Sequence, residues 1–388
     1  MRTVPLREAI ELRNEIVHPR DNPRGEATFV GLEHIEPNTG RRIGSLPIRL
    51  EDLTGRKARF HTGDIVYGYL RPYLNKVWVA DFDGYCSVDQ YVFRPKPDFD
   101  ARYVAAFMRS PLFLERAPLD ETPGQLPRIR TDEVLEVEVP SPPHSEQRRI
   151  GAKLGEQLAT TASVRQGTEQ QLDGAASLRA AIVLRAAAGG HGRVKLGDAA
   201  AVQLGKMLGP AARTGLNPAP YLRNANVQWG RISTDNLLEM DFDDEERTKF
   251  TLVAGDVLVC EGGEPGRAAV WRGDRIDVFY QKALHRVRCN PRLLDPDFLV
   301  YALWAAALTG QFSGENSKST IAHLPAVRLK ALQLELPPVA DQRRIARSIQ
   351  QDLASIDAMT RAIEAQREAV DALPAALLRR TFEKIEAT

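Results

Sequence analysis

Residues 217–221, Asn-Pro-Ala-Pro-Tyr, come closest to a catalytic motif in this sequence. In an Asn-Pro-Pro-aromatic motif, the Asn side chain and a Pro carbonyl accept hydrogen bonds from the amino group of a flipped adenine, and the ring stacks on the base. Here Ala219 interrupts that spacing, and no glycine-rich cofactor loop follows a strand upstream. We therefore favour a proline-rich entry to a strand over a methyl-transfer site.

Other motifs with chemical potential are equally incomplete. Residues 261–264, Glu-Gly-Gly-Glu, have the glycines of a phosphate cradle but lack the Gly-Lys-Ser/Thr of a P-loop and a following helix. The seven histidines show no metal-ligand spacing, and Cys86, Cys260 and Cys289 lack the paired spacing of a zinc site. The sequence thus predicts no catalytic residue, no metal site and no cofactor on this chain.

Polar and aromatic side chains that suit DNA contacts follow a predicted strand at residues 63–68. Arg and Lys neutralise phosphates, while Arg and Asn also match the edges of guanine and adenine. The alternative is a half-buried strand followed by a solvated basic turn. The candidates in this half are Tyr69, Arg71, Asn75, Lys76, Arg128 and Arg130.

A comparable polar group is found in the second half of the chain. The chain contains 52 Lys and Arg residues and 51 Asp and Glu residues, so its net charge of +1 gives no global attraction to nucleic acid. A DNA surface would therefore have to be a local patch. The candidates in this half are Lys206, Arg223, Asn224, Asn226, Gln228, Lys282 and Lys318.

The elements that must position these side chains occur twice. Residues 142–150, Pro-Pro-His-Ser-Glu-Gln-Arg-Arg-Ile, return at 337–345 with an offset of 195, and Gly-Asp-Ile-Val at 63–66 returns as Gly-Asp-Val-Leu at 255–258. Such a repeat indicates two similar halves, each a mixed α/β globule followed by a helix. The composition predicts strands at 63–68, 90–93, 256–260 and 268–271, with a turn at 262–266 between the last two. Short helices are predicted at 103–109 and 298–308.

A long helix is predicted after each copy of the Pro-Pro motif. Its start would be capped by Ser145 or Asp341, and Pro374 would kink or end the second helix near Leu373. Apolar residues at three- and four-residue steps predict a narrow coiled-coil seam, antiparallel if the halves are related by a pseudo-two-fold axis. A plain dimerisation or domain-linking role is the alternative. The seam is predicted to contain Ile150, Leu154, Leu158, Val164, Leu172, Leu178 and Ile182 in the first helix, and Ile345, Ile349, Leu353, Ile356, Met359, Ile363, Val370, Leu373 and Leu377 in the second.

Composition sets the broad class. At 388 residues the chain is long enough for two domains, and its hydrophobic content of 43% is that of a soluble globular protein. No stretch approaches the roughly 20 apolar residues of a membrane helix, and the first residues lack the apolar core of a signal peptide. An odd number of scattered cysteines fits reduced cytosolic thiols. We expect a cytoplasmic protein with no membrane partner.

The order of these repeats resembles the specificity subunits of type I restriction–modification systems. Residues 63–76 resemble that family's G-D-I-L-Y-G-x-L-R-P-Y-L-N-K stretch, and residues 255–267 resemble its G-D-V-L followed by E-G-G-x-x-G-R. The resemblance implies an α+β fold with two pseudo-symmetric target recognition globules separated by two long antiparallel coiled-coil helices. It implies domains at 1–143 and 191–338, and spacer and docking helices at 144–190 and 339–388.

The function implied by the resemblance is that of a non-catalytic DNA reader. Each globule would recognise half of a bipartite asymmetric site in double-stranded DNA, and the helices would dock two adenine-methylating modification subunits. Those subunits would carry S-adenosylmethionine, and a motor-nuclease subunit is a further candidate partner. The alternative is a degenerate scaffold that bridges proteins without reading sequence. Only the DNA reader predicts basic clusters on the same face of both globules.

Overall fold

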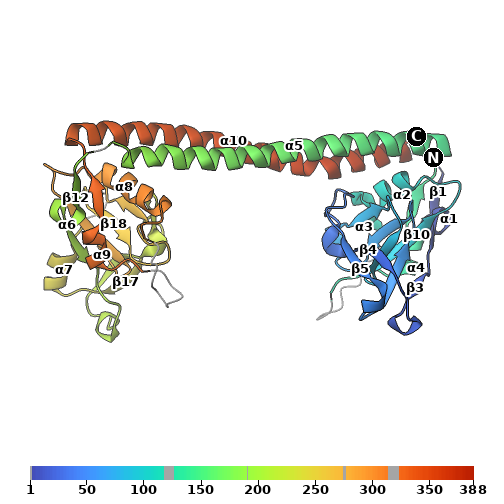
Figure 1. The fold of residues 1–388 in the computed structure, drawn as a ribbon, viewed down its shortest axis with the longest axis horizontal. Coiled ribbons are helices and arrows are strands. Elements are labelled where there is room, and N and C mark those ends of the chain that lie inside the picture. The colour runs from blue at the N-terminus through green and yellow to red at the C-terminus, as the bar shows by residue number, and fades with distance from the viewer. Residues whose placement is uncertain (1, 118–125, 190, 274–276, 313–322) are drawn as a thin grey trace. The chain divides into compact units, whose positions relative to one another are not determined.

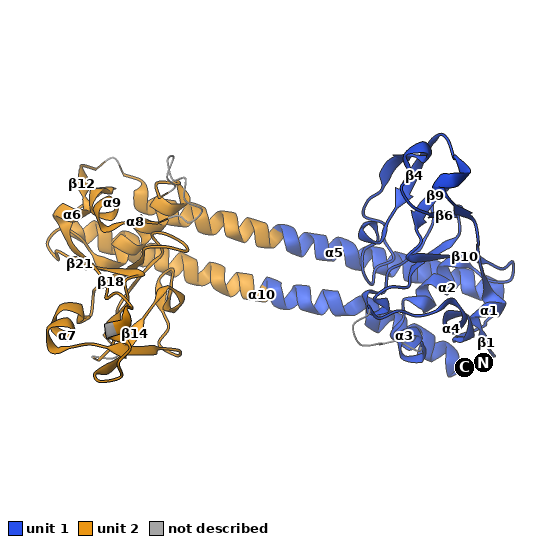
Figure 2. Ribbon diagram, turned by 90° about the horizontal axis from the view of Figure 1, so that it is seen from below, with its two compact units in different colours: residues 1–170, 363–388 blue, residues 171–362 orange. Residues whose placement is uncertain are grey.

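The chain forms two compact units, residues 1–170 with 363–388 and residues 171–362, which are blue and orange in Figure 2. The computed structural model describes all residues except 1, 118–125, 190, 274–276 and 313–322. Each unit contains one globule and a stretch of each long helix, α5 (His144–Leu184) and α10 (Val339–Glu386). The mixed globules and long helices predicted from the sequence are confirmed.

The first globule is built on an antiparallel sheet with strand order β2-β10-β7-β8, of which β10 is labelled in Figure 1. A second sheet, β3-β6-β9-β4-β5, contains the parallel pair β4–β9, and β1 pairs with β11. The strands are β1 Thr3–Pro5, β2 Ile10–Leu12, β3 Ile16–Val17, β4 Glu26–Val30, β5 Leu46–Arg49, β6 Lys57–Phe60, β7 Ile65–Gly68, β8 Val77–Val79, β9 Gly84–Ser87, β10 Gln90–Pro95 and β11 Glu138–Pro140. The helices are α1 Leu6–Ala9, α2 Ala101–Met108, α3 Pro111–Arg116 and α4 Thr131–Glu136, with 3-10 turns at Pro19–Asp21, Leu32–His34, Leu50–Asp52 and Pro72–Leu74.

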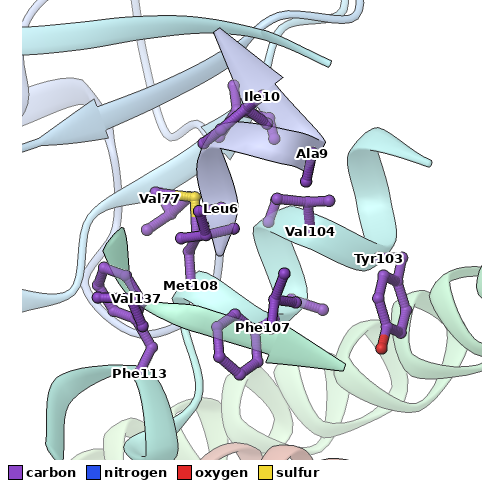
Figure 3. Close-up of a cluster of buried hydrophobic side chains, with 14 of the residues drawn as sticks. Leu6, Ala9, Ile10, Val77, Tyr103, Val104, Phe107, Met108, Phe113 and Val137 are labelled. Atoms are coloured by element: carbon purple, nitrogen blue, oxygen red, sulfur yellow. The ribbon is translucent and has the colours of Figure 1, made fainter. Parts of the chain in front are cut away.

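The core of the first unit joins this globule to its stretches of the long helices. Helix α2 begins where the Asp100 carboxylate accepts a hydrogen bond from the Tyr103 N–H at 2.9 Å, and six of its residues are buried. Figure 3 shows α2 side chains meeting those of α1 and β8 in this cluster. On α10, the Phe382 ring lies 5.4 Å from the Tyr103 ring and 5.3 Å from the Phe107 ring.

The second globule repeats the first. Its main sheet has the order β13-β21-β18-β19, β12 pairs with β22, and β14 lies between β17 and a parallel β20. The strands are β12 Arg193–Lys195, β13 Ala200–Leu204, β14 Pro218–Leu222, β15 Val227–Gln228, β16 Arg231–Ile232, β17 Leu238–Asp241, β18 Val257–Cys260, β19 Ala268–Val270, β20 Phe279–Tyr280, β21 Leu284–Cys289 and β22 Gln333–Glu335. The helices are α6 Leu196–Ala199, α7 Asp244–Phe250, α8 Pro296–Leu308 and α9 Ala326–Ala331, with 3-10 turns at Pro210–Ala212 and Asn224–Asn226.

A buried glutamine fastens the start of α5 to the first globule. Gln147 is 1% exposed, and its amide nitrogen donates to the carbonyl oxygens of Pro142 at 2.9 Å and Asp98 at 3.3 Å. Its amide oxygen accepts from the Asp100 N–H at 3.0 Å. The glutamine of the Pro-Pro motif therefore serves the fold, because it satisfies backbone groups that would otherwise be buried without partners.

The same arrangement recurs at the start of α10. Gln342 is fully buried, donates to the carbonyls of Leu293 and Pro337 at 2.8 Å each, and accepts from the Asp295 N–H at 2.8 Å. The predicted caps, Ser145 and Asp341, instead lie inside the first turn, because α5 begins at His144 and α10 at Val339.

The two helices are antiparallel within each unit. In the first unit Ile150, Leu154 and Leu158 of α5 share a buried cluster with Leu378 and Phe382 near the end of α10. In the second unit Ile349 and Leu353 of α10 share one with Val183 near the end of α5, and Ile345 packs against its edge. Each predicted stripe is therefore buried by the far end of the other helix. Ile356 is also buried, at 4% exposure.

The middle of the seam differs from the prediction at four positions, whereas Ile363 and Val370 of α10 are buried as predicted, at 8% and 7% exposure. Val164, Leu178, Met359 and Leu373 are between 41% and 49% exposed. The buried positions in the middle of α5 are instead small or polar. The hydroxyls of Thr161 and Thr168 bond back to helix carbonyls, at 3.0 Å to Gln157 and 2.7 Å to Arg165, and can therefore be buried without loss of a partner. These seam positions are Thr161, Thr168 and Ala175.

Pro374 does not end α10, which continues to Glu386. A proline inside a helix removes one hydrogen bond and costs about 3 kcal/mol. Beyond it, Leu378 and Phe382 are 1% and 0% exposed in the core of the first unit. Full burial of two such side chains contributes about 1.5–3 kcal/mol each, which offsets the cost.

Candidate nucleic-acid interface

A short ladder brings together candidate residues that are far apart in the first half of the sequence. Leu70 forms an antiparallel bridge with Arg128. On either side, the Arg71 N–H donates to the Pro127 carbonyl at 2.7 Å, and the Ile129 N–H donates to the Tyr69 carbonyl at 3.3 Å. We call residues 69–71 with 127–129 the first ladder. It places three of the predicted side chains, those of Tyr69, Arg71 and Arg128, on one small segment.

A second ladder occupies the equivalent place in the other half. Gly262 bridges His323, and the Leu324 N–H donates to the Glu261 carbonyl at 2.7 Å. The offset of 192 between the two Gly-Asp motifs makes Leu70 equivalent to Gly262. Residues 261–263 with 323–324 are therefore the second ladder. The turn that we predicted at Glu-Gly-Gly-Glu is confirmed, since it lies between β18 and β19.

Each ladder is held by one side chain from the main sheet. The Tyr91 hydroxyl donates to the Ile129 carbonyl at 3.3 Å. At the equivalent place, His285 Nε2 lies 2.8 Å from the Leu324 carbonyl, which it can reach only as a donor. Tyr91 is paired with Tyr67 and His285 with Val259 in their sheets, so the two holding residues sit at matching positions of β10 and β21.

Arg71 has an unusual backbone conformation. Its φ is +52°, in the left-handed region that costs an L-residue other than Gly roughly 1–2 kcal/mol. The equivalent residue in the second ladder is Gly263, with φ +78°, which pays no such penalty. The Arg71 side chain is exposed and forms no hydrogen bond or ion pair with the described residues. The backbone of Arg71 is thus part of the fold, whereas its charged side chain has no hydrogen-bond or ion-pair partner among the described residues.

The first ladder also contains aromatic and further charged side chains. The Tyr69 ring stacks on the Tyr91 ring, with centroids 4.3 Å apart and planes 17° apart. Burial and the nearby charge of Asp89 raise the pKa of the Tyr69 hydroxyl, and the charges of Arg128 and Arg56 act against that rise. Arg128 is exposed, as is Arg130, whose N–H donates to the Glu133 carboxylate at 2.7 Å.

Two other candidates of the first half have structural roles. Asn75 is 3% exposed, has φ +50°, and donates from its amide to the Arg109 carbonyl at 2.7 Å. The Lys76 ammonium donates to the Leu32 carbonyl at 2.6 Å. We therefore remove both from the interface, because their donors already hold neighbouring loops.

Three candidates of the second half also have structural roles. Lys206 is bonded to the Asp241 carbonyl at 2.7 Å and to the Glu246 carboxylate, and only 11% of its side chain is exposed. Asn226 is 4% exposed and caps its turn by accepting from the Arg223 N–H at 3.0 Å. Asn224 donates to the Gly262 carbonyl at 2.9 Å, which makes it a support of the second ladder.

The remaining candidates differ in accessibility. Gln228 and Lys282 are exposed, and Arg223 is half-buried. Lys318 lies outside the described residues. Sequence reasoning missed Arg231, which faces Gln228 across the β15–β16 hairpin and is also exposed. The two-residue turn ending in Gly230, with φ +70°, was the signal that could have indicated this hairpin.

The motif at residues 217–221 is part of a strand, as predicted. β14 begins at Pro218, and Tyr221 is 3% exposed in the core of the second globule. A buried ring cannot stack on a flipped base. The three cysteines are free thiols, and no helix among the described residues has the length and apolarity needed to cross a membrane.

The fold is a duplicated globule-and-helix architecture, and comparisons relate it to known proteins. The EcoDI specificity subunit of a type I restriction enzyme from Escherichia coli is 30% identical over 179 residues, 46% of this chain and 39% of that protein. The StySPI specificity subunit from Salmonella potsdam is 24% identical over 323 residues, 78% of this chain and 68% of that protein. The matched regions thus span less than half of the first relative and about two thirds of the second. No family model matches the chain.

Solved structures share the whole fold. A chain from a structure described as the "Structural basis underlying complex assembly and conformational transition of the type I R-M system" has a TM-score of 0.80 at 21% identity, covering 98% of this chain and 97% of that one. The HsdS subunit from Thermoanaerobacter tengcongensis has a TM-score of 0.64 at 20% identity, covering 98% and 96%. The chain is therefore similar in sequence to specificity subunits of type I restriction enzymes, the resemblance that its motifs indicated, and it shares its fold with these solved structures.

His285 is expected to make the second globule acid-sensitive. Burial lowers the pKa of its imidazole from 6.5, despite the opposing effects of the Leu324 carbonyl and Glu261. The unfolded chain therefore binds more protons at this histidine than the folded chain does. The contribution of neutral His285 to stability is complete above about pH 6.5 and is lost as the pH falls below that value. His285→Gln keeps a donor without titrating. In denaturation between about pH 8 and pH 5, the parent should lose more stability than this variant; an equal loss would contradict the assignment.

Proposed function

We propose that this chain is the DNA-reading specificity subunit of a type I restriction–modification system. The observation that carries the proposal is Arg71, an exposed cation held in a left-handed conformation where the repeat has glycine. Backbone strain at an exposed position is typical of functional sites. The Arg guanidinium forms bidentate contacts with guanine or with phosphate, and the exposed Arg128 lies opposite Leu70 in the same ladder.

The target would be bipartite and asymmetric, because the two ladders share a backbone design but differ in side chains. The first presents Arg71 and Arg128, whereas the equivalent residues of the second are Gly263 and His323. Nearby residues that suit base or phosphate contacts also differ, since the second globule exposes Gln228, Arg231 and Lys282. Two ladders with similar backbones but different side chains would recognise different DNA half-sites.

We further propose that the chain itself is not catalytic. Its nearest approach to a methyltransferase motif includes Tyr221, whose ring is buried. Adenine methylation would come from two modification subunits that bind S-adenosylmethionine and dock on α5 and α10, and a motor-nuclease subunit would add cleavage. A target reader of this kind acts in the cytoplasm, where the chromosome and its partners are.

Methylome sequencing tests this function directly. Cells that produce this chain with its cognate modification subunit should acquire adenine methylation at one bipartite sequence. Exchanging residues 200–330 for those of another specificity subunit should change one half-site and leave the other as it was. The exchange of residues 10–135 is the matched control and should change the opposite half-site. Methylation without sequence preference would instead support a scaffold that bridges proteins.

A further inference from the structure

A hollow lies between the first globule and the long helices of its own unit. Its volume is about 470 Å³. On the globule side it is lined by the hairpin of residues 35–43, which an antiparallel bridge closes between Ile35 and Arg42. On the helix side it is lined by residues within 158–165 of α5 and 370–374 of α10. The side chains that cross this hollow therefore determine how the hairpin is held against the helices.

One ion pair crosses the hollow. The buried carboxylate of Glu36 accepts a hydrogen bond from the guanidinium of Arg165 on α5. It also accepts from Arg41 Nε at 3.0 Å and from the Thr39 hydroxyl at 2.9 Å, both on the hairpin. Burial opposes ionisation, but these three donors lower the pKa of the Glu36 carboxyl group below its usual value. Among the described residues, no other ion pair or side-chain hydrogen bond joins this hairpin to α5 or α10.

The hairpin is in turn connected to Arg71. The Asn38 N–H donates to the Asn75 carbonyl at 3.2 Å. Asn75 follows the 3-10 turn Pro72–Leu74, and Arg71 precedes that turn. A continuous path of bonded groups therefore runs from Arg165 on α5, through the hairpin and the turn, to Arg71.

This ion pair holds α5 beyond the core of the first unit. The α5 side chains in that core end at Leu158, and Arg165 lies about 10 Å further along the helix. Apolar packing is non-directional, whereas a charge-assisted hydrogen bond to a guanidinium adds geometric specificity. The pair therefore gives the globule a second, directional attachment to α5.

The second unit has no equivalent ion pair. With the offset of 195, Arg165 corresponds to Thr360, which carries no charge. With the offset of 192, Glu36 corresponds to Gln228, whose side chain has no hydrogen bond to either long helix within the described part of the chain. This attachment is thus particular to the globule that contains Arg71.

We propose that Glu36 and Arg165 are positioning residues, which hold Arg71 at a fixed place relative to α5 and so restrict the distance between half-sites that the chain accepts. This rests on the proposed function and adds a determinant of that distance outside the DNA interface. Without the ion pair the first globule would be free to turn on α5. A displacement of Arg71 by about 3.4 Å along the duplex corresponds to one base pair. A chain without the pair should therefore also accept half-sites one base pair closer together or further apart.

Methylome sequencing of cells that produce the chain with its cognate modification subunit tests this inference. The parent should methylate its bipartite site at one spacer length. Glu36→Gln keeps the size of the side chain but removes its charge. It should increase methylation of sites with a spacer one base pair longer or shorter by at least about tenfold, the scale of a charge-assisted hydrogen bond. The bases of both half-sites should stay the same, because Arg71 is unchanged.

Two further variants separate the ion pair from general effects on the fold. Glu33→Gln removes an exposed carboxylate next to the hairpin whose described ion pair is with His34 rather than with α5, and it should keep the parent's spacer. The double variant E36R/R165E reverses the pair. It should restore the single spacer length that R165E alone relaxes.

The possible failures are distinguishable. If the parent methylates no bipartite site, the proposed function fails and the inference fails with it. If Glu36→Gln methylates only at the parent's spacer, or if it changes the bases of a half-site, only the inference is overturned. If Glu36→Gln methylates no site at all, R165E and E36R/R165E decide, and equal spacer selectivity in those two variants would overturn the inference.

Discussion

Exchanging Arg71 for glycine should weaken DNA binding while it stabilises the fold. Glycine adopts φ +52° without the roughly 1–2 kcal/mol that this conformation costs other residues. Its greater freedom in the unfolded chain offsets part of that gain, which leaves about 0.5–1 kcal/mol. Loss of a bidentate base contact costs about 1–3 kcal/mol, or roughly 5- to 150-fold in affinity. Chemical denaturation and fluorescence anisotropy with target DNA measure the two effects.

Two further variants separate strain from recognition. Asn38 also has a left-handed backbone, with φ +63°, and is exposed. Asn38→Gly should therefore act on stability alone. Arg71→Lys keeps the charge but loses the fork of donors, so it should retain affinity if Arg71 contacts only phosphate and lose it if Arg71 reads a base. An Arg71→Gly variant with unchanged DNA affinity would remove Arg71 from the interface.

The sequence composition predicted the strands that position the site better than it predicted which side chains belong to the site. Strands β7, β10, β18 and β19 lie where Gly, Asp and Pro turn signals bounded β-branched and aromatic runs. Those signals are local. The pairing of Leu70 with Arg128 is not, because no local pattern links residues so far apart in the sequence. The first ladder could therefore be found only from the structure.

Residue type also could not show which cations were already occupied. Lys76 and Lys206 have the charge of a phosphate contact, but each meets a backbone carbonyl, of Leu32 and Asp241. Such partners come from the tertiary fold and leave no trace in a window of sequence. By contrast, the equivalence of Arg71 and Gly263 follows from the two Gly-Asp motifs alone. Comparing the halves position by position would have marked Arg71 without coordinates.

The helix seam shows the limit of hydrophobic periodicity. Met359 was predicted to be in the seam because it is apolar and three residues after Ile356. It is 43% exposed, whereas Ile349 is fully buried. Similarly, Thr168 is buried at 2% exposure although it is polar. A pattern that counts apolar residues misplaces the stripe wherever small or self-bonded polar residues occupy the seam.

Aspartate at these two positions should therefore have very different effects. Ile349 is enclosed in the second core with Val183 and Leu353, so Ile349→Asp would bury a carboxylate without a partner and cost about 3–5 kcal/mol. Met359→Asp places the same group on an exposed face of the same helix, where substitutions usually change stability by about 0.5 kcal/mol or less. Thermal and chemical denaturation of both variants compare them directly. Large losses of stability in both variants would mean that Met359 is in the seam as the periodicity predicted. Small losses in both variants would mean that Ile349 is not enclosed by the end of α5.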